Sequence, residues 1–215
     1  MKTRILSSFL LVSLIVSGCG FWGIRGNGRV RGEDRKVGEF TRIEAGGAYT
    51  IHVTVGSAPS VRISAEENLL GLISTRVRNN ALIIDTKRNI SPRKEVVIDI
   101  TTPSLNYLDA SGANNIDVEN LSGAEFNVDL SGAGNVKVRG EVDRFNVELS
   151  GAGSINAKEL KAKDVRVSVS GAASADVYAS RNLDASVSGV GSIDYYGNPE
   201  KTKTDVSGVG SISRK

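Results

Sequence analysis

The 215-residue sequence predicts an all-β protein whose larger part is a parallel β-helix, a solenoid that adds one coil per repeat. Two observations predict this fold. The first is a triplet, Ser-Gly-Ala or Ser-Gly-Val, that recurs six times at near-constant spacing. The second is a strict alternation of apolar and polar residues on both sides of the triplet. A fixed period of about 20 residues is typical of solenoids, in which each repeat stacks on the last.

The triplets set the period and the register of the repeats. Successive serines are separated by 20, 19, 20, 18 and 19 residues, and they are Ser111, Ser131, Ser150, Ser170, Ser188 and Ser207. One residue before each serine are Ala110, Leu130, Leu149, Val169, Val187 and Val206. Five residues after it are Ile116, Val136, Ile155, Ala175, Ile193 and Ile212. Polar residues lie between these positions, so each arm is a strand with one buried face.

Each repeat therefore reads as strand, small-residue corner, strand and a return loop, with coils about 4.8 Å apart. Glycine suits such a corner because it adopts dihedral angles closed to other residues and allows close backbone approach. An antiparallel sandwich also has short alternating strands, but it does not require the same triplet at every corner. We assign residues 104–215 to the β-helix, and the more polar last coil, residues 200–215, is predicted to cap it.

Residues 1–18 have the features of a signal peptide. Lys2 and Arg4 precede an apolar run that is too short to span a bilayer as a finished helix. The run ends in Val16-Ser17-Gly18-Cys19, which resembles the lipobox of bacterial lipoproteins. This resemblance implies cleavage before Cys19 and lipid attachment to its thiol, and Gly20 after it implies sorting to the outer membrane. The alternative is an ordinary signal peptide that happens to contain the chain's one cysteine.

Residues 19–38 are predicted to be a flexible tether, because glycines alternate with charged residues there. Gly26-Asn27-Gly28 is not interpreted as a dinucleotide-binding loop, since no strand is expected before it and no helix after it.

Residues 39–103 are predicted to be an irregular β-rich region. Strands are expected over 49–55, 61–65 and 95–101, with a hairpin over 76–83. Gly46-Gly47-Ala48 shares the register of the serine triplets and is interpreted as a seventh corner. Ser122-Gly123-Ala124 does not share it and is interpreted as an accidental copy in a return loop.

These features together resemble the bacterial head GIN domain family, whose members are labelled autotransporter adhesins. The matching stretches include Phe40-Thr41-Arg42-Ile43, Glu67-Asn68-Leu69-Leu70, Leu82-Ile83-Ile84 and the triplet series that ends in Tyr196-Gly197-Asn198-Pro199. The resemblance implies a right-handed parallel β-helix and a location in the cell envelope.

The candidate ligand-binding residues are Asp109, Asp129 and Glu148, which occupy the same outward position in three successive repeats. Stacked like charges cost stability, so this column is either a binding site for a glycan, a cation or a protein, or a solvated face that Lys137 and Arg139 offset. His52, the only histidine, is expected on the surface of a strand and not as a base or metal ligand. The serines recur at every corner, as structural residues do and a nucleophile does not. No cofactor, metal or catalytic residue is predicted, and the repeats lack the aspartates of calcium-binding solenoids.

The predicted function is a non-enzymatic, lipid-anchored module of the cell envelope that binds a glycan, the cell wall or a protein. An envelope scaffold or stress-regulatory accessory protein is the alternative, and a carbohydrate-active enzyme is the third interpretation. Removal of Lys2 and Arg4 lowers the formal charge from +3 to +1, and charges of both signs are interspersed along the repeats. Nucleic-acid binding is therefore not expected.

Overall fold

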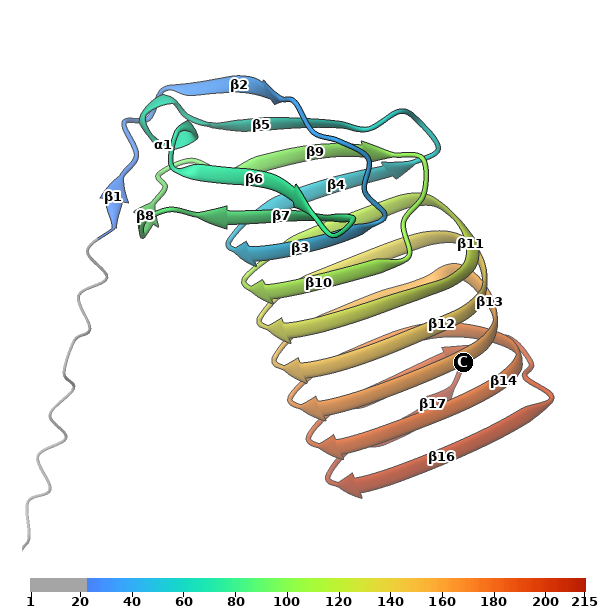
Figure 1. Ribbon diagram of the computed structural model, residues 1–215. Coiled ribbons are helices and arrows are strands. Elements are labelled where there is room, and N and C mark those ends of the chain that lie inside the picture. Colours follow the sequence, from blue (N-terminus) through green and yellow to red (C-terminus); the bar gives the residue numbers. More distant parts are fainter. Residues whose placement is uncertain (1–22) are drawn as a thin grey trace, which may run out of the picture.

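The computed structural model describes residues 23–215, and Figure 1 shows them coiled into a β-solenoid. The regular coils comprise β10 (Tyr107–Gly112), β11 (Asn115–Gly132), β12 (Asn135–Gly151), β13 (Ser154–Gly171), β14 (Ser174–Gly189), β15 (Ser192–Tyr196), β16 (Lys201–Gly208) and β17 (Ser211–Arg214). Neighbouring coils pair in parallel throughout. In Figure 1 the front arms run to the left, the chain passes behind them to the right, and each coil lies below the last. This sense is right-handed, and the predicted fold class is confirmed.

The coils form two opposed sheets. We call the arms that end at the glycine corners the front sheet and the arms that follow the corners the back sheet, as they lie in Figure 1. Inward residues stack on one another between the sheets: Leu108, Val128, Val147, Val167 and Ala185 are consecutive partners in the front sheet. The rings of Phe126 and Phe145 stack in a neighbouring column with centroids 6.0 Å apart. The core is therefore a set of apolar columns parallel to the solenoid axis.

The corner glycines are required by both dihedral angle and space. Their φ angles lie between +95° and +142°, and they are Gly112, Gly132, Gly151, Gly171, Gly189 and Gly208. A Cβ atom at any of them would lie 2.2 to 2.7 Å from the carbonyl oxygen of the glycine one coil earlier. No L-residue fits such a position without a shift of the backbone.

The return side of the coil differs from the predicted loops. Each of β11 to β14 continues around this side as one strand, with register shifts at the bend. Ser122-Gly123-Ala124 lies within β11, and Gly123 pairs with Val142 of the next coil. The prediction of a return loop was wrong because the backbones of successive coils bend together and keep their hydrogen bonds.

The N-terminal region extends both sheets. It comprises β3 (Arg42–Gly47), β4 (Thr50–Val55), β5 (Ser60–Glu66), α1 (Glu67–Leu70), β6 (Ile73–Arg78), β7 (Ala81–Thr86), β8 (Ile90–Ser91) and β9 (Val97–Thr102). Gly46 and Gly47 of β3 pair with Ser111 and Gly112, which confirms the seventh corner. β6 and β7 form the expected hairpin, with Asn79 and Asn80 at φ angles of 51° and 61°.

The predicted tether is wrong for two segments, which form β1 (Ile24–Arg25) and β2 (Val30–Arg35). β2 pairs antiparallel with β5 at the edge of the back sheet, and β1 pairs with β8. The buried carboxylate of Glu66 accepts hydrogen bonds from the backbone N–H groups of Gly28 and Arg93, at 2.5 and 2.7 Å. Pairing through the main chain needs no apolar side chains, so a glycine-rich, charged segment can dock as a strand. The signal peptide and Cys19 lie outside the described residues.

No helix within residues 23–215 has the length and apolar character needed to span a membrane.

Candidate binding surfaces

A column of four carboxylates runs along the outer surface of the front sheet. Glu44, Asp109, Asp129 and Glu148 are lateral partners on four successive strands. The structure therefore brings together the three predicted residues and adds Glu44. The sequence carried the signal for Glu44, which stands two residues before the corner residue Gly46, as Asp109 stands two before Ser111.

The carboxylates of the column are not paired with cations. None of its four carboxylates forms an ion pair with another described residue, although thirteen ion pairs connect the described residues elsewhere. Burial raises the pKa of Asp109, the charges of Asp129 and Glu44 raise it further, and Arg42 opposes the shift. Adjacent like charges on neighbouring strands are destabilising, so the column lowers the stability of the fold at neutral pH.

One aromatic residue borders the column. The Tyr107 hydroxyl donates a hydrogen bond to the Asp129 carboxylate, and this bond is the main reason that the Tyr107 pKa rises to about 12. The Arg42 guanidinium lies 4.1 Å from the centre of the Tyr107 ring, so its charge faces the aromatic ring.

A ladder of amides lies beside the carboxylate column. Asn146 Nδ2 donates to Asn127 Oδ1 at 2.9 Å and to Glu125 Oε1 at 3.0 Å. Asn127 stands two residues before Asp129, and Asn146 two before Glu148, so amides and carboxylates form parallel columns on one face. Such a face presents regularly spaced hydrogen-bond acceptors along the solenoid axis.

The expected compensation by Arg139 is wrong. Arg139 lies in the back sheet, where its Nη1 contacts Asp117 Oδ1 at 2.8 Å and Glu119 Oε1 at 2.7 Å. The two arms of a coil face opposite sides of the molecule, so an arginine on the second arm cannot reach carboxylates on the first. Lys137 also lies on the back sheet, beside Asp117.

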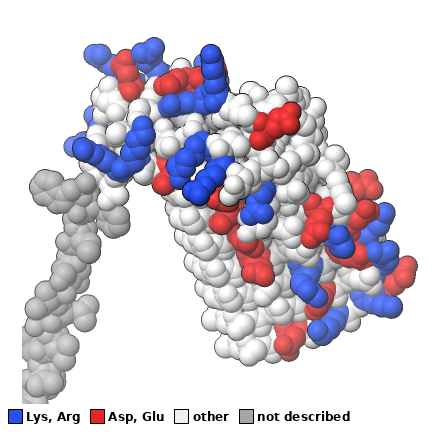
Figure 2. All heavy atoms as spheres, in the orientation of Figure 1, with Lys and Arg blue, Asp and Glu red and all other residues white. Residues whose placement is uncertain are grey.

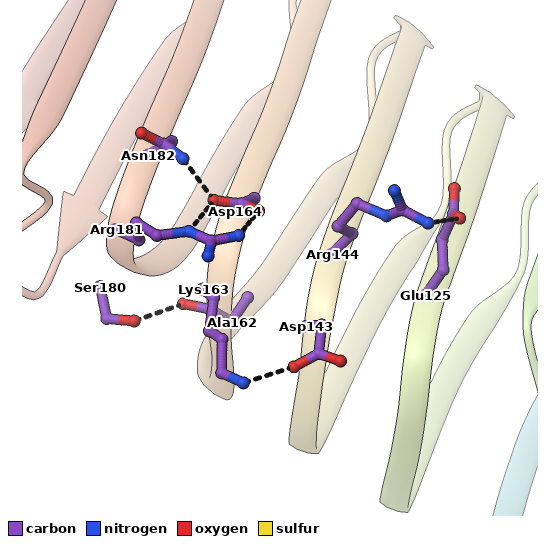
Figure 3. A network of polar contacts seen from close by, with 9 residues as sticks. All are labelled: Glu125, Asp143, Arg144, Ala162, Lys163, Asp164, Ser180, Arg181 and Asn182. Atoms are coloured by element: carbon purple, nitrogen blue, oxygen red, sulfur yellow. Dashed lines mark hydrogen bonds and ion pairs between the residues drawn. The ribbon is translucent and has the colours of Figure 1, made fainter.

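A second polar cluster occupies the return side and was not predicted. Figure 3 shows three ion pairs between successive coils: Glu125 with Arg144, Asp143 with Lys163, and Asp164 with Arg181. The Arg181 hydrogen bond is the main cause that lowers the Asp164 pKa to about 2, and the Asn182 amide also donates to this carboxylate at 2.6 Å. The charges here are paired from coil to coil, so this ladder serves stability.

An open depression of about 460 Å³ adjoins the ladder on the front sheet. Its lining includes Arg144, Arg166 and Lys201 together with Asp164 and Asp184. Arg166 forms an ion pair with Asp184 across the coils. Arg144 and Asp164 are paired with residues of the return-side ladder.

His52 is exposed on β4, as predicted. Its Nδ1 atom lies 2.9 Å from Asp99 Oδ1 on the adjacent strand β9, a partner that sequence spacing could not reveal. Within residues 23–215, no group of three or more histidine, cysteine, aspartate or glutamate side chains is arranged to hold a metal ion.

Known proteins resemble this chain in sequence and in fold. Residues 39–199 match the family described as "Putative auto-transporter adhesin, head GIN domain". A solved structure of a "putative adhesin" from Bacteroides fragilis NCTC 9343 is similar with a TM-score of 0.75 and 28% identity, and the match covers 90% of this chain and 100% of that chain. No match was found among curated proteins.

Two further structures support the fold alone. A "putative adhesin" from Parabacteroides merdae ATCC 43184 has a TM-score of 0.58 and 19% identity over 90% of this chain and 99% of that chain. Another, from Parabacteroides distasonis ATCC 8503, has a TM-score of 0.53 and 18% identity over 90% of this chain and 100% of that chain.

Proposed function

Because this chain belongs to the head GIN domain family of adhesin-like proteins, we propose that it is a lipid-anchored, non-enzymatic binding module of the bacterial cell envelope. The family supports the adhesin-like role and a place in the envelope. The lipobox-like sequence that ends at Cys19 supports an anchor in the outer membrane. The ligand class that we propose is a glycan, the cell wall or a protein.

The observation that carries the proposed binding role is the unpaired carboxylate column. Stability alone would favour alternating charges on neighbouring strands, as the return-side ladder has them. Four adjacent carboxylates without an ion-pair partner among the described residues instead suit a ligand that supplies the donors. Sugar hydroxyls or basic side chains of a protein could hydrogen-bond to these carboxylates and to the Asn127 and Asn146 amides.

The binding role is tested with the unlipidated full chain, Cys19→Ser, on arrays of glycans and cell-wall fragments and on intact cells. The double variant Asp129→Asn/Glu148→Gln should weaken binding by about tenfold or more, because each charge-assisted hydrogen bond is worth roughly 1.5 to 3 kcal/mol. The matched control is Glu200→Gln/Asp205→Asn, which neutralises two exposed carboxylates that have no ion-pair partner among the described residues. Equal affinities of the two double variants would contradict the carboxylate column as the site.

The anchor is tested separately in cells. Cys19→Ser should abolish palmitate labelling and move the protein from the detergent phase to the aqueous phase, because no lipid remains. Unchanged labelling of the variant would rule the lipoprotein interpretation out. Protease treatment of intact cells then separates a surface adhesin, which is cleaved, from a periplasmic scaffold, which is protected.

A further inference from the structure

The two ends of the molecule carry opposite net charge. Residues 23–95 contain 13 Lys and Arg against 8 Asp and Glu, a net charge of +5. Residues 96–215 contain 12 against 16, a net charge of −4. The near-neutral total therefore conceals an electric dipole along the solenoid, with the positive end at β1 and β2 (Figure 2).

The positive charge gathers where the chain passes from residue 22 into the folded body. Exposed basic residues surround β1 and β8 there, and we call them the basic face: Arg25, Arg29, Lys87, Arg88, Arg93 and Lys94. The pairing of Arg25 with Ser91 and the hydrogen bonds of Glu66 to both Gly28 and Arg93 hold the two segments together. Figure 2 shows Lys and Arg side chains gathered at this end of the molecule.

The basic face is also short of counterions. None of its six side chains forms an ion pair with another described residue, whereas seven of the twelve basic residues of 96–215 do. Basic side chains without acidic partners on a rigid surface are free to bind external anions.

The distance between this face and residue 19 is limited by the chain. Gly23 follows Cys19 by four residues, which span at most about 14 Å when fully extended. If residues 19–38 formed a free tether, residue 19 and the folded body could lie about 65 Å apart. Because β1 and β2 are docked, a lipid on Cys19 would keep Gly23, which precedes the basic face, within about two Debye lengths of the membrane surface.

We propose that the basic face is a docking surface for anionic phospholipid headgroups. Its arginine and lysine side chains bind the phosphodiester groups, and the acidic solenoid is repelled from the same surface. The two effects together hold the solenoid upright, with β16 and β17 pointing away from the membrane. The orientation rests on the proposed anchor, but binding of phospholipid by the basic face is a property of the unlipidated protein and can fail or succeed without it.

The test uses full-length Cys19→Ser protein and vesicles of phosphatidylglycerol mixed with phosphatidylcholine, against vesicles of phosphatidylcholine alone. Co-sedimentation should be at least about tenfold stronger with the anionic vesicles and should weaken as salt rises. Trp22 is the only tryptophan of the chain and precedes the basic face, so its emission should shift on binding.

The decisive comparison is between two triple charge reversals. Arg25→Glu/Arg29→Glu/Arg88→Glu should reduce co-sedimentation by at least about tenfold. Lys137→Glu/Lys158→Glu/Lys201→Glu changes the total charge equally but lies on the solenoid, and it should retain binding. Thermal unfolding of both variants excludes a loss of fold as the cause.

Equal loss in the two variants would overturn the proposal, because net charge and not the basic face would then govern binding. Equal binding to neutral and anionic vesicles would overturn it too. Neither result bears on palmitate labelling of Cys19 or on ligand binding by the carboxylate column, so failure here is distinguishable from failure of the proposed function.

Discussion

Substitution of Gly151 by alanine tests whether the stacked corners hold the solenoid together. Gly151 lies in the middle of the glycine column with a φ of +136°, and an added Cβ would lie 2.4 Å from the carbonyl oxygen and 2.9 Å from the nitrogen of Gly132. The backbone strain costs about 1 to 3 kcal/mol, and the overpacking costs about as much again. A loss of about 2 to 6 kcal/mol is a large part of the stability of an ordinary domain.

Gly123→Ala is the matched control. Gly123 has a φ of +153°, but a Cβ there would meet no atom within 4 Å, so the control carries the dihedral strain without the clash. Thermal unfolding followed by circular dichroism should place Gly151→Ala below Gly123→Ala by roughly 2 to 12 °C, since about 1 kcal/mol shifts the midpoint by 2 to 4 °C at this size. Equal midpoints would refute the stacked-corner argument.

Three further predictions concern charge and the C-terminal end. Asp109→Asn should stabilise the protein at neutral pH, because the raised pKa of Asp109 means that stability is lost as pH rises from about 3.9 through the folded value. Asp164→Asn should destabilise it, because a pKa of about 2 gives stability that is present above the unfolded value and lost as pH falls toward 2. Urea unfolding at neutral and acidic pH measures whether each substitution raises or lowers the free energy of unfolding. Deletion of residues 200–215 should make the protein self-associate, which light scattering detects.

The regular coils could be predicted because every position in them stacks on its equivalent. The alternation of apolar and polar residues that indicates one strand recurs in the next coil. The sequence therefore repeats the signal for the inward columns and the glycine corners six times. The same logic placed Asp109, Asp129 and Glu148 side by side, which the register bears out. The family resemblance is confirmed by the match over residues 39–199.

The docked strand β2 could not be predicted because its partner is non-local and its side chains are solvated. All but one of its residues are exposed, so no apolar period marks it. Its hydrogen bonds go to β5, about thirty residues later in the chain. No local pattern marks Glu66 either, although its buried carboxylate connects two segments that are distant in the sequence.

The ion pairs escaped prediction for a different reason. Their partners depend on register shifts at the return bend, where the coils differ in length. Arg139, for example, contacts acidic residues of both adjacent coils on its own side of the molecule. A spacing of about twenty residues predicts which coil a side chain contacts. It does not predict the sheet on which the partner lies, unless the corner has been placed correctly.

The form of self-association after deletion of residues 200–215 follows from the difference between the two ends. Deletion would expose the ends of two inward columns, at Val187 and Ile193. In the intact protein these residues pair with Val206 and Ile212. Fibres would require the other end of a second copy to accept these strands in parallel. That end presents β2 and β6, which both run antiparallel to their neighbours, and β2 is exposed and charged. Truncated chains should therefore join through their bared ends and stop at dimers, whereas long fibres would show that the N-terminal end is not closed.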